Sequence, residues 1–485
     1  MNRYRQFTST VAILALLSAC GGDDDQTAIA PPSTPPISAP PPATVVGCSL
    51  RERQDFALAQ LREFYLFPEL LDLSVSPANY STVQAYIDAL VAPARAQNRD
   101  RFFTYITSIA EENAFFNSGS TAGFGIRLTS NVAEGRVTIA ETFEGTPALA
   151  AGIDRGTEIL AIGTSATDLV TVRDLLASGG SGAVTNALGP GDPGLTRVLR
   201  VRDKDGTVRE VTLSKAKFNI DPVSDRYGAL IINDNGKKVG YVNLRVFIGA
   251  PAESDLRAAF ARFKAEGITE VIVDLRYNGG GLVSIAELLT NLLLGQRSSS
   301  DVQSFTVFRP EKAVNNETTF FMPQPESISA TKIAFITTGS SASASELVAN
   351  AVLPYLGSNA ALIGSDTFGK PVGQIAIDRA QCDDRLRILA FATQNANRQG
   401  DYFDGLASKF DSTCRAPDDL SNQLGEPQEA SIMTALDFLA GRACTPIGTI
   451  GTANTQGFRE DRGRSELIKP AQPKGTVERD LPGAY

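Results

Sequence analysis

A run of serines and a single lysine, each placed after a predicted strand, are the residues best able to do chemistry in this chain. Ser341-Ala-Ser-Ala-Ser-Glu346 follows the apolar, β-branched segment 332–338 and precedes a helical pattern of apolar residues. Ser343 and Glu346 have the spacing of a capping box, whose side chains bind main-chain N–H groups at a helix start. Ser343 is therefore either a helix cap alone or a nucleophile beside unpaired N–H donors.

The chain contains no histidine, and this absence limits how a serine could be activated. A Ser-His-Asp triad, a Cys-His pair and a His-ligated zinc site are all excluded. A neutral lysine can accept the proton instead. Lys370 is the candidate base, because it follows the apolar segment 361–364 and Pro371 favours extended backbone at Lys370. Lowering a lysine pKa from about 10.4 to near 7 takes about 4 kcal/mol, which burial can supply.

Gln374 lies in the strand-like segment 373–377, four residues after Lys370. Its amide could orient the lysine ammonium group, or it could stand exposed on the strand. The pattern by itself leaves both interpretations open.

A glycine-rich turn follows the predicted strand 270–274 and reads Asp274-Leu-Arg-Tyr-Asn-Gly-Gly-Gly281. Glycines allow main-chain N–H groups to approach a ligand closely, as an oxyanion hole requires. The alternative is a tight turn between a strand and a helix. Strands and helices alternate from residue 239 to residue 294, which predicts an α/β unit.

Together these motifs resemble the tail-specific or C-terminal processing proteases, serine peptidases of the S41 type. The resemblance covers roughly residues 50–440 and rests on four matching pieces: Ser341–Glu346, Thr367-Phe-Gly-Lys370, Gln374 and Asp274–Gly281. Two features depart from the family. Lys370 follows Ser343 at a longer sequence spacing than in most members. Pro354 occupies a position where many members carry an aspartate, so the role of that aspartate has no counterpart at this position.

The resemblance assigns roles to individual residues. It implies that Ser343 is the nucleophile, Lys370 the base and Gln374 the support of that base. It also implies that the oxyanion hole is formed by the N–H of Gly279 or Gly280 together with that of Ala344.

A β-rich region, residues 116–216, resembles a PDZ domain through Gly145-Thr-Pro-Ala-Leu-Ala-Ala-Gly-Ile153 and Gly123-Phe-Gly-Ile126. The resemblance implies that the main chain of Gly123, Phe124, Gly125 and Ile126 binds a chain-terminal carboxylate, while the substrate peptide adds a strand beside it. A generic β-rich interaction domain is the alternative.

The predicted fold class is α/β. A crotonase/ClpP-like βαβ catalytic domain is expected over residues 217–444, preceded by a helical domain over 49–115 and the PDZ-like domain over 116–216. Residues 445–485 are polar and charge-balanced, and we predict that this tail is disordered.

The N-terminus has the features of an export signal: Arg3 and Arg5 precede the apolar run 11–17, and Leu17-Ser-Ala-Cys20 matches the bacterial lipobox. This implies a signal peptide over residues 1–19, lipidation of Cys20 and a proline-rich linker over 20–48. The expected location is that of an exported lipoprotein on the periplasmic side of the membrane, at the outer membrane. An ordinary signal peptide with a nearby cysteine is the alternative.

Four of the five cysteines remain if Cys20 is lipidated, and in an oxidising compartment they allow three pairings. We favour Cys382 with Cys414, which closes an excursion after the active-site strand. Cys48 with Cys444 would then tie the start of the domain to its last helix.

The net charge of −9 provides no basic footprint for nucleic acid. No metal site and no cofactor are predicted. The sequence therefore predicts a serine endopeptidase that hydrolyses polypeptides near their C-termini, with a lipid anchor as its contact with the membrane and an unspecified oligomeric state. The alternative is a non-catalytic, PDZ-containing peptide-binding lipoprotein.

Overall fold

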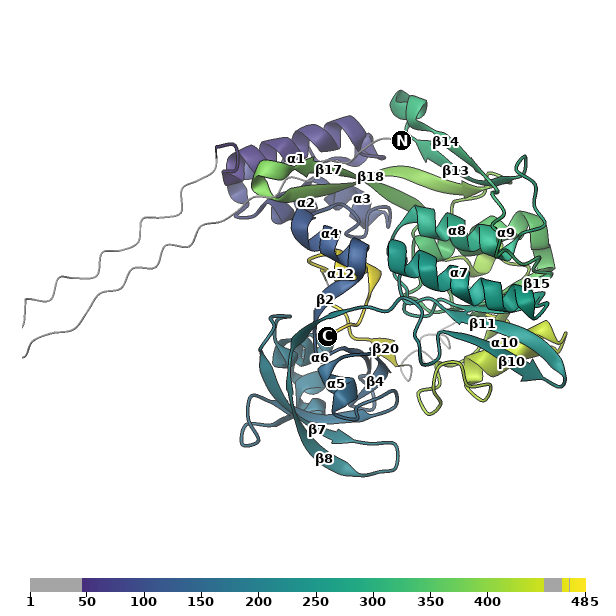
Figure 1. Ribbon diagram of the computed structural model, residues 1–485. Helices are drawn as coiled ribbons and strands as arrows, with labels where there is room; N and C mark the ends of the chain where they lie inside the picture. Colours follow the sequence, from purple (N-terminus) through teal and green to yellow (C-terminus); the bar gives the residue numbers. More distant parts are fainter. Residues whose placement is uncertain (1–45, 449–464, 471) are drawn as a thin grey trace, which may run out of the picture. The chain divides into compact units, whose positions relative to one another are not determined.

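The computed structural model describes residues 46–448, 465–470 and 472–485 (Figure 1). The predicted signal peptide, the lipidation site Cys20 and nearly all of the predicted linker lie outside the described residues. Across the described ranges, every helix is too short or too polar to cross a membrane.

A six-stranded sheet carries the serine and lysine motifs, in the order β10-β11-β12-β15-β16-β19. Its strands are β10 (Ala229–Asp234), β11 (Lys237–Asn243), β12 (Glu270–Asp274), β15 (Lys332–Thr337), β16 (Ala360–Gly364) and β19 (Ser412–Arg415). All of them run parallel except β10, which is antiparallel to β11. Because parallel strands end at one edge of a sheet, the loops after β12, β15 and β16 meet there.

Helices cover both faces of this sheet. One face carries α7 (Ala250–Ala265), α8 (Val283–Leu293) and α9 (Ala344–Leu356), and the other carries α10 (Ala430–Leu439). Successive side chains of a strand point to opposite faces of the sheet. Phe335 accordingly packs with α7–α9, and its neighbour Ile336 packs with α10. These layers confirm the predicted mixed α/β class.

A five-stranded sheet lies beside this unit, with the order β1-β18-β13-β14 and with β17 also paired to β18. Its strands are β1 (Tyr105–Ser108), β13 (Val302–Phe308), β14 (Glu317–Phe320), β17 (Val372–Arg379) and β18 (Asp384–Asn395). The N-terminal helices α1 (Leu50–Phe64), α2 (Val83–Leu90) and α3 (Ala92–Ala96) share a core with β17 and β18. Lys370 lies two residues before the start of β17, and Gln374 belongs to this strand.

The predicted β-rich region is observed as a further sheet of the order β20-β3-β4-β5-β7-β8, with β6 paired to β5. Its elements are β3 (Ile126–Asn131), β4 (Arg136–Thr142), α5 (Pro147–Ala150), β5 (Glu158–Gly163), β6 (Val170–Thr171), α6 (Val172–Leu188), β7 (Thr196–Arg202), β8 (Val208–Ser214) and β20 (Glu466–Leu467). The pair β2 (Ser120–Gly123) and β9 (Ala216–Asn219) forms its own two-stranded sheet, and α4 (Ile109–Ser118) precedes β2.

Short 3₁₀ helices complete the described elements: η1 (Pro68–Leu70), η2 (Pro77–Asn79), η3 (Pro310–Asn315), η4 (Gly357–Asn359), η5 (Ala380–Cys382) and η6 (Ala407–Lys409).

The predicted disorder of the tail is wrong for residues 465–470 and 472–485. Strand β20 pairs with β3, and α12 (Thr476–Asp480) follows. Ile468 and Leu481 are fully buried. The polar composition hid this order because only a few apolar side chains anchor the segment, while its main chain is paired with other parts of the molecule.

The predicted disulfide pairing is also wrong. Cys48 is bonded to Cys382, and Cys414 is bonded to Cys444, so neither Cys382–Cys414 nor Cys48–Cys444 forms. Cys414 lies on β19 and Cys444 follows α10, which packs against that strand. The loop that this disulfide closes is therefore local.

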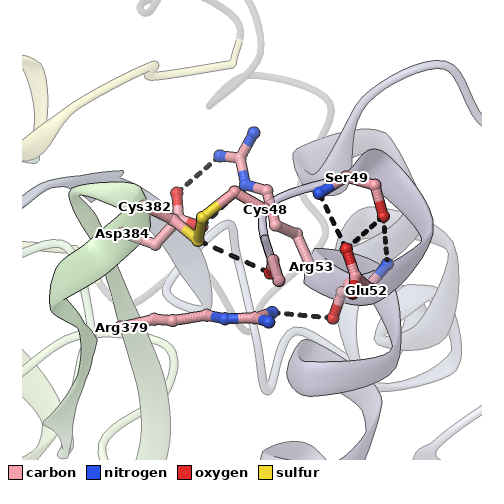
Figure 2. The surroundings of a disulfide bond; sticks show 8 residues. Cys48, Ser49, Glu52, Arg53, Arg379, Cys382 and Asp384 are labelled. Atoms are coloured by element: carbon pink, nitrogen blue, oxygen red, sulfur yellow. Dashed lines mark hydrogen bonds and ion pairs between the residues drawn. A yellow bond between two sulfur atoms is a disulfide. The ribbon is translucent and has the colours of Figure 1, made fainter. Parts of the chain in front are cut away.

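The Cys48–Cys382 disulfide joins the start of α1 to the turn between β17 and β18 (Figure 2). Polar contacts join the same two parts: Arg53 forms an ion pair with Asp384, and Arg379 donates to the Glu52 carbonyl at 2.8 Å. Because α1 packs along β18, Cys48 is brought to this turn rather than to the last helix.

Candidate active site

Ser343 lies at the junction of β15 and α9, as the sequence predicts. It directly precedes the first residue of α9 and has φ +56° and ψ −112°. A side chain other than glycine is uncommon at positive φ, and such a backbone costs about 1–3 kcal/mol that the surroundings must offset. The turn therefore holds the serine in a fixed, strained position.

The neighbouring serines have structural roles that Ser343 does not share. The Ser341 hydroxyl donates to the Leu275 carbonyl at 2.8 Å, and the Ser345 hydroxyl donates to the Asn278 carbonyl at 3.0 Å. Both side chains are buried, whereas Ser343 is partly exposed. Within the described residues, the Ser343 hydroxyl donates to no acceptor. It is therefore the serine of this run whose proton is available for transfer.

Glu346 joins the serine turn to the lysine turn. Its Oε2 accepts from the main-chain N–H of Ser343 at 2.9 Å and from that of Lys370 at 2.8 Å. Its Oε1 accepts from the Gly369 N–H at 2.7 Å and from the Thr367 hydroxyl at 2.6 Å. The predicted contact between Ser343 and Glu346 is thus present, and the carboxylate also reaches the second motif.

The Glu346 side chain is fully buried, and burial raises the pKa of its carboxyl, while these hydrogen bonds act in the opposite direction. A carboxylate that accepts several N–H groups in a dry site fixes the donors relative to one another. The main chains of Ser343 and Lys370 are consequently held on a single oxygen atom.

Lys370 is buried, with 6% of the residue exposed. Its Nζ donates to the Gln374 Oε1 at 3.2 Å and lies 4.8 Å from the centre of the Phe103 ring. Burial lowers the pKa of the Lys370 amine to about 8, although Asp480 acts to raise it. A substantial fraction of this amine is therefore neutral in mildly alkaline solution.

Gln374 orients the amine and is itself oriented. Its Nε2 donates to the Phe103 carbonyl at 2.7 Å, which leaves Oε1 to face Lys370. This is the first of the two interpretations that the sequence left open. Ser343 and Lys370 themselves are not joined by a hydrogen bond in the described chain, and proton transfer requires an approach to about 3 Å, which in unliganded sites is often completed only on binding.

The glycine-rich turn lies against the candidate nucleophile. A side-chain carbon added to Gly280 would lie 2.9 Å from the Ser343 Cβ and 3.3 Å from the Ala344 nitrogen. The Gly280 N–H donates to the Asn278 side chain at 2.9 Å, and the Gly279 N–H donates to the Asp480 carbonyl at 3.0 Å. Gly279 is thus the glycine whose N–H already faces a main-chain carbonyl, as an oxyanion donor would.

A buried ion cluster around Arg276 stabilises the glycine-rich turn. Arg276 makes paired hydrogen bonds to Glu429, each 2.8 Å long, and contacts Asp274 at 3.0 Å. Although burial acts to lower it, Asp274 and Glu429 raise the pKa of Arg276 well above its usual value. This cation is permanently charged and is fully compensated.

An open cavity of about 610 Å³ lies among residues of several elements of this part of the molecule. Val283, which follows the glycine turn, lines it together with Ile375, which follows Gln374. Phe308 and Phe391 add an aromatic wall, and Glu287 stands among them. Ser343, Lys370 and Gln374 are not among the residues that line this cavity.

The predicted peptide-binding loop, Gly123–Ile126, is not joined to Ser343 by any hydrogen bond in the described ranges. It contacts the last residue of the sequence instead: the N–H groups of Gly125 and Ile126 donate to the Tyr485 main-chain oxygen at 2.9 and 3.2 Å. The structure thus brings Ser343, Glu346, Lys370 and Gln374 together and places this loop elsewhere.

Two parts of the site escape sequence reasoning. Phe103 supplies both the ring beside Lys370 and the carbonyl that accepts from Gln374. It falls in the predicted helical domain, residues 49–115, where no sequence pattern indicated a site residue. Asp480 reaches Gly279 from a tail whose composition indicated disorder. Only the aromatic pair Phe102-Phe103 could have hinted at a buried turn.

Comparison with known proteins identifies the region that contains these residues. The family model described as Peptidase family S41 matches residues 238–399, a range that includes the glycine turn, Ser343, Lys370 and Gln374. Residues 238–399 are thus similar to peptidase family S41. This assignment supports a serine-type peptidase and agrees with the resemblance seen in the motifs.

The S41 domain has relatives among characterised proteins. The chain is 28% identical over 255 residues to the carboxyl-terminal-processing protease of Picosynechococcus sp., covering 52% of this chain and 55% of that protein. It is 32% identical over 222 residues to carboxyl-terminal-processing peptidase 1 of Arabidopsis thaliana chloroplasts, covering 45% and 41%. The chain thus spans about half the length of the curated relatives that it matches.

A solved structure shares the fold. The crystal structure of a putative S41 protease from Bacteroides fragilis aligns with a TM-score of 0.60 and 23% sequence identity, covering 80% of this chain and 97% of that one. At this identity the match shows the fold of this chain alone and carries no assignment of individual residues.

Proposed function

We propose that this chain is a serine endopeptidase that cleaves polypeptides near their C-termini, with Ser343 as nucleophile, Lys370 as base and Gln374 as the support of that base. The observation that carries the proposal is the position of Glu346, whose Oε2 accepts from the N–H groups of both Ser343 and Lys370. A structural helix cap needs only the first of these hydrogen bonds.

The proposed reaction uses only groups of this chain. Neutral Lys370 takes the hydroxyl proton as Ser343 Oγ attacks the scissile carbonyl carbon, and the N–H groups of Gly279 and Ala344 stabilise the oxyanion. The tetrahedral intermediate expels the amine, which receives the proton from Lys370. Lys370 then accepts a proton from the water that attacks the acyl-enzyme. It gives this proton to the departing Ser343 Oγ, which frees the carboxyl product and restores the serine hydroxyl and the neutral amine.

Substrate binding is proposed to involve a PDZ-like domain built on β3–β8. The support is the pairing of β3 with an added antiparallel segment, because the Tyr485 N–H donates to the Ile126 carbonyl and the Leu128 N–H donates to the Gly483 carbonyl. This is the form of strand addition by which such domains hold peptides. The alternating strands and helices around Ser343 likewise support a crotonase-like arrangement of the catalytic domain.

We also propose export and lipidation at Cys20, which would place the enzyme on the periplasmic side of the outer membrane. The two disulfides, Cys48–Cys382 and Cys414–Cys444, support an oxidising compartment. A Cys20→Ser variant is expected to leave the membrane fraction, as fractionation and immunoblotting would show. Retention of that variant would contradict the lipid anchor.

Proteolysis tests the proposed nucleophile. Ser343→Ala is expected to lower the cleavage of an unstructured polypeptide at least 10³-fold, with a nearly unchanged Tm. Ser345→Ala is the matched control: it loses the hydrogen bond to the Asn278 carbonyl and is expected to affect the Tm more than the chemistry. Mass spectrometry of the products measures cleavage. If Ser343→Ala cleaves as fast as the wild-type chain, the proposal is wrong.

A second candidate function is peptide binding without turnover, as a PDZ-containing lipoprotein. It is favoured by the missing hydrogen bond between Ser343 and Lys370 in the described chain and by the Asp480 carbonyl on Gly279. If this function holds, purified protein will bind polypeptides without releasing fragments at any pH, and Ser343→Ala will bind them equally well.

A further inference from the structure

The last ten residues of the sequence, Thr476–Tyr485, run from the candidate active site to the Gly123–Ile126 loop. Residues 476–480 form α12, and residues 480–483 are buried. We refer to residues 476–485 as the terminal segment. Neither the proposed reaction nor the family assignment gives this segment a role.

At the candidate site the terminal segment contacts the glycine-rich turn. The Asp480 carbonyl accepts from the Gly279 N–H at 3.0 Å, where the oxyanion of a substrate is expected. A side chain on Gly279 would collide with the Arg479 carbonyl, so the approach of the two backbones depends on this glycine. The Asp480 side chain is 8% exposed and interacts electrostatically with Lys370.

At the other end the terminal segment extends the sheet of β3. Tyr485 and Ile126 exchange main-chain hydrogen bonds at 2.8 and 3.2 Å, and Ala484 lies opposite Arg127 in antiparallel register. The carbonyl group of Tyr485 also packs so closely on Gly123 that any side chain there would collide with it. The loop predicted to bind a peptide is therefore filled by this chain itself.

Side chains anchor the segment between these two ends. The Thr476 hydroxyl donates to the Glu112 carboxylate at 2.6 Å, and Arg479 donates to the Phe102 carbonyl at 3.0 Å and lies over the Tyr105 ring. Leu481 is fully buried in the core that also contains Ala344. These contacts fix the terminal segment in one position on the molecule.

We propose that the terminal segment is an internal peptide ligand of the candidate site, which a polypeptide substrate must displace before it reaches Ser343. This proposal rests on the proposed function and deepens it, because the segment also indicates the substrate class. A competing polypeptide segment must fill the same positions.

The position of Tyr485 defines that class. Its hydroxyl lies 2.8 Å from the Thr185 hydroxyl and donates to the Ile468 carbonyl at 3.2 Å. These polar partners favour an aromatic side chain with a hydroxyl, since a segment without one leaves them unpaired. Polypeptide segments with tyrosine after small residues such as glycine and alanine are therefore the expected competitors.

Binding measurements test the proposal without any need for turnover. In the full chain carrying Ser343→Ala, a fluorescent peptide with the sequence of residues 476–485 is titrated and followed by anisotropy. Tyr485→Ala in the chain should free the groove and lower the apparent Kd at least 10-fold, because a larger fraction of molecules is open. Tyr485→Phe, which removes only the hydroxyl, should lower it less.

Matched controls sharpen this test. Lys474→Ala lies just before the segment, is exposed and should leave the Kd unchanged. A labelled peptide with alanine in place of its last tyrosine should bind the Tyr485→Ala chain at least 10-fold more weakly. The proposal is overturned if folded Tyr485→Ala chain binds the tyrosine peptide no more tightly than the parent chain, or if the alanine peptide binds as tightly.

The failure of this proposal is distinguishable from the failure of the proposed function. If the peptide exchanges as expected while chain with Ser343 intact cleaves no polypeptide, the enzyme proposal fails and the internal ligand stands. If polypeptides are cleaved but Tyr485→Ala leaves peptide binding unchanged, only the internal ligand fails.

Discussion

Arg276 and Lys370 are both buried cations near the carboxyl edge of the parallel sheet, and their surroundings differ in kind. Arg276 is 1% exposed and meets the carboxylates of Asp274 and Glu429. Lys370 donates a hydrogen bond to one neutral amide and faces an aromatic ring. The carboxylates keep the pKa of Arg276 high, whereas burial brings the pKa of Lys370 down to about 8.

The difference shows that one sheet edge holds two kinds of buried cation, one paired with carboxylates and one hydrogen-bonded to a neutral amide. A buried cation with matched carboxylates cannot give up its proton and serves to fix the glycine turn. A buried amine whose hydrogen-bond partner is neutral is destabilised in its charged form by the loss of water, and it can act as a base. The following substitutions test this division.

Replacing Lys370 by methionine should give the largest effect. Lys370→Met keeps most of the volume and removes the base, so cleavage should fall at least 10³-fold, about 4 kcal/mol in activation free energy. Folding should not suffer, because the wild-type chain carries the cost of a buried charge below pH 8. Initial rates and thermal melts measure both effects.

Lys409→Met is the control, because this lysine is exposed and should change neither quantity. A Lys370→Met chain that keeps its activity would show that the amine is only a packing element.

Arg276→Met should act on stability. Removing one partner of a buried ion cluster leaves Asp274 and Glu429 uncompensated, and the free energy of unfolding should fall by about 3–5 kcal/mol. Denaturant titration measures this change. Arg51→Met, which breaks an exposed pair with Asp55, should have no measurable effect. A stable Arg276→Met chain with reduced activity would instead place Arg276 in the chemistry.

A region could be predicted from the sequence where its contacts join residues close together in the chain, and could not where they join distant residues. The places of Ser343, Lys370 and Gln374 at turns and strand ends could be predicted from the sequence because local patterns set them, while their catalytic roles stay predictions. Arg276 pairs with Glu429 and Cys48 with Cys382 across most of the domain, and no local pattern encodes such contacts. The terminal segment was missed because a few buried groups, such as Leu481, outweigh its polar composition.

Gln374→Leu should produce the smallest effect and the most specific one. The glutamine accepts a hydrogen bond from the amine, which favours the charged form, so its loss should lower the pKa of Lys370 further. One hydrogen bond is worth about 1 kcal/mol, which corresponds to less than one pH unit. The midpoint of the pH–rate profile should therefore move to lower pH. A shift to higher pH would contradict the assigned orientation of the amide.

The pH dependence of covalent labelling tests the central claim most directly. Wild-type and Lys370→Met chains are treated with a fluorophosphonate probe from pH 6 to 10, and the labelled residue is identified by peptide mass mapping. We expect labelling at Ser343 alone, with a rate that rises about tenfold per pH unit below a midpoint near 8 and levels off above it, and no labelling of the Lys370→Met chain. A pH-independent rate, or equal labelling of both chains, would contradict the activation of Ser343 by a neutral Lys370.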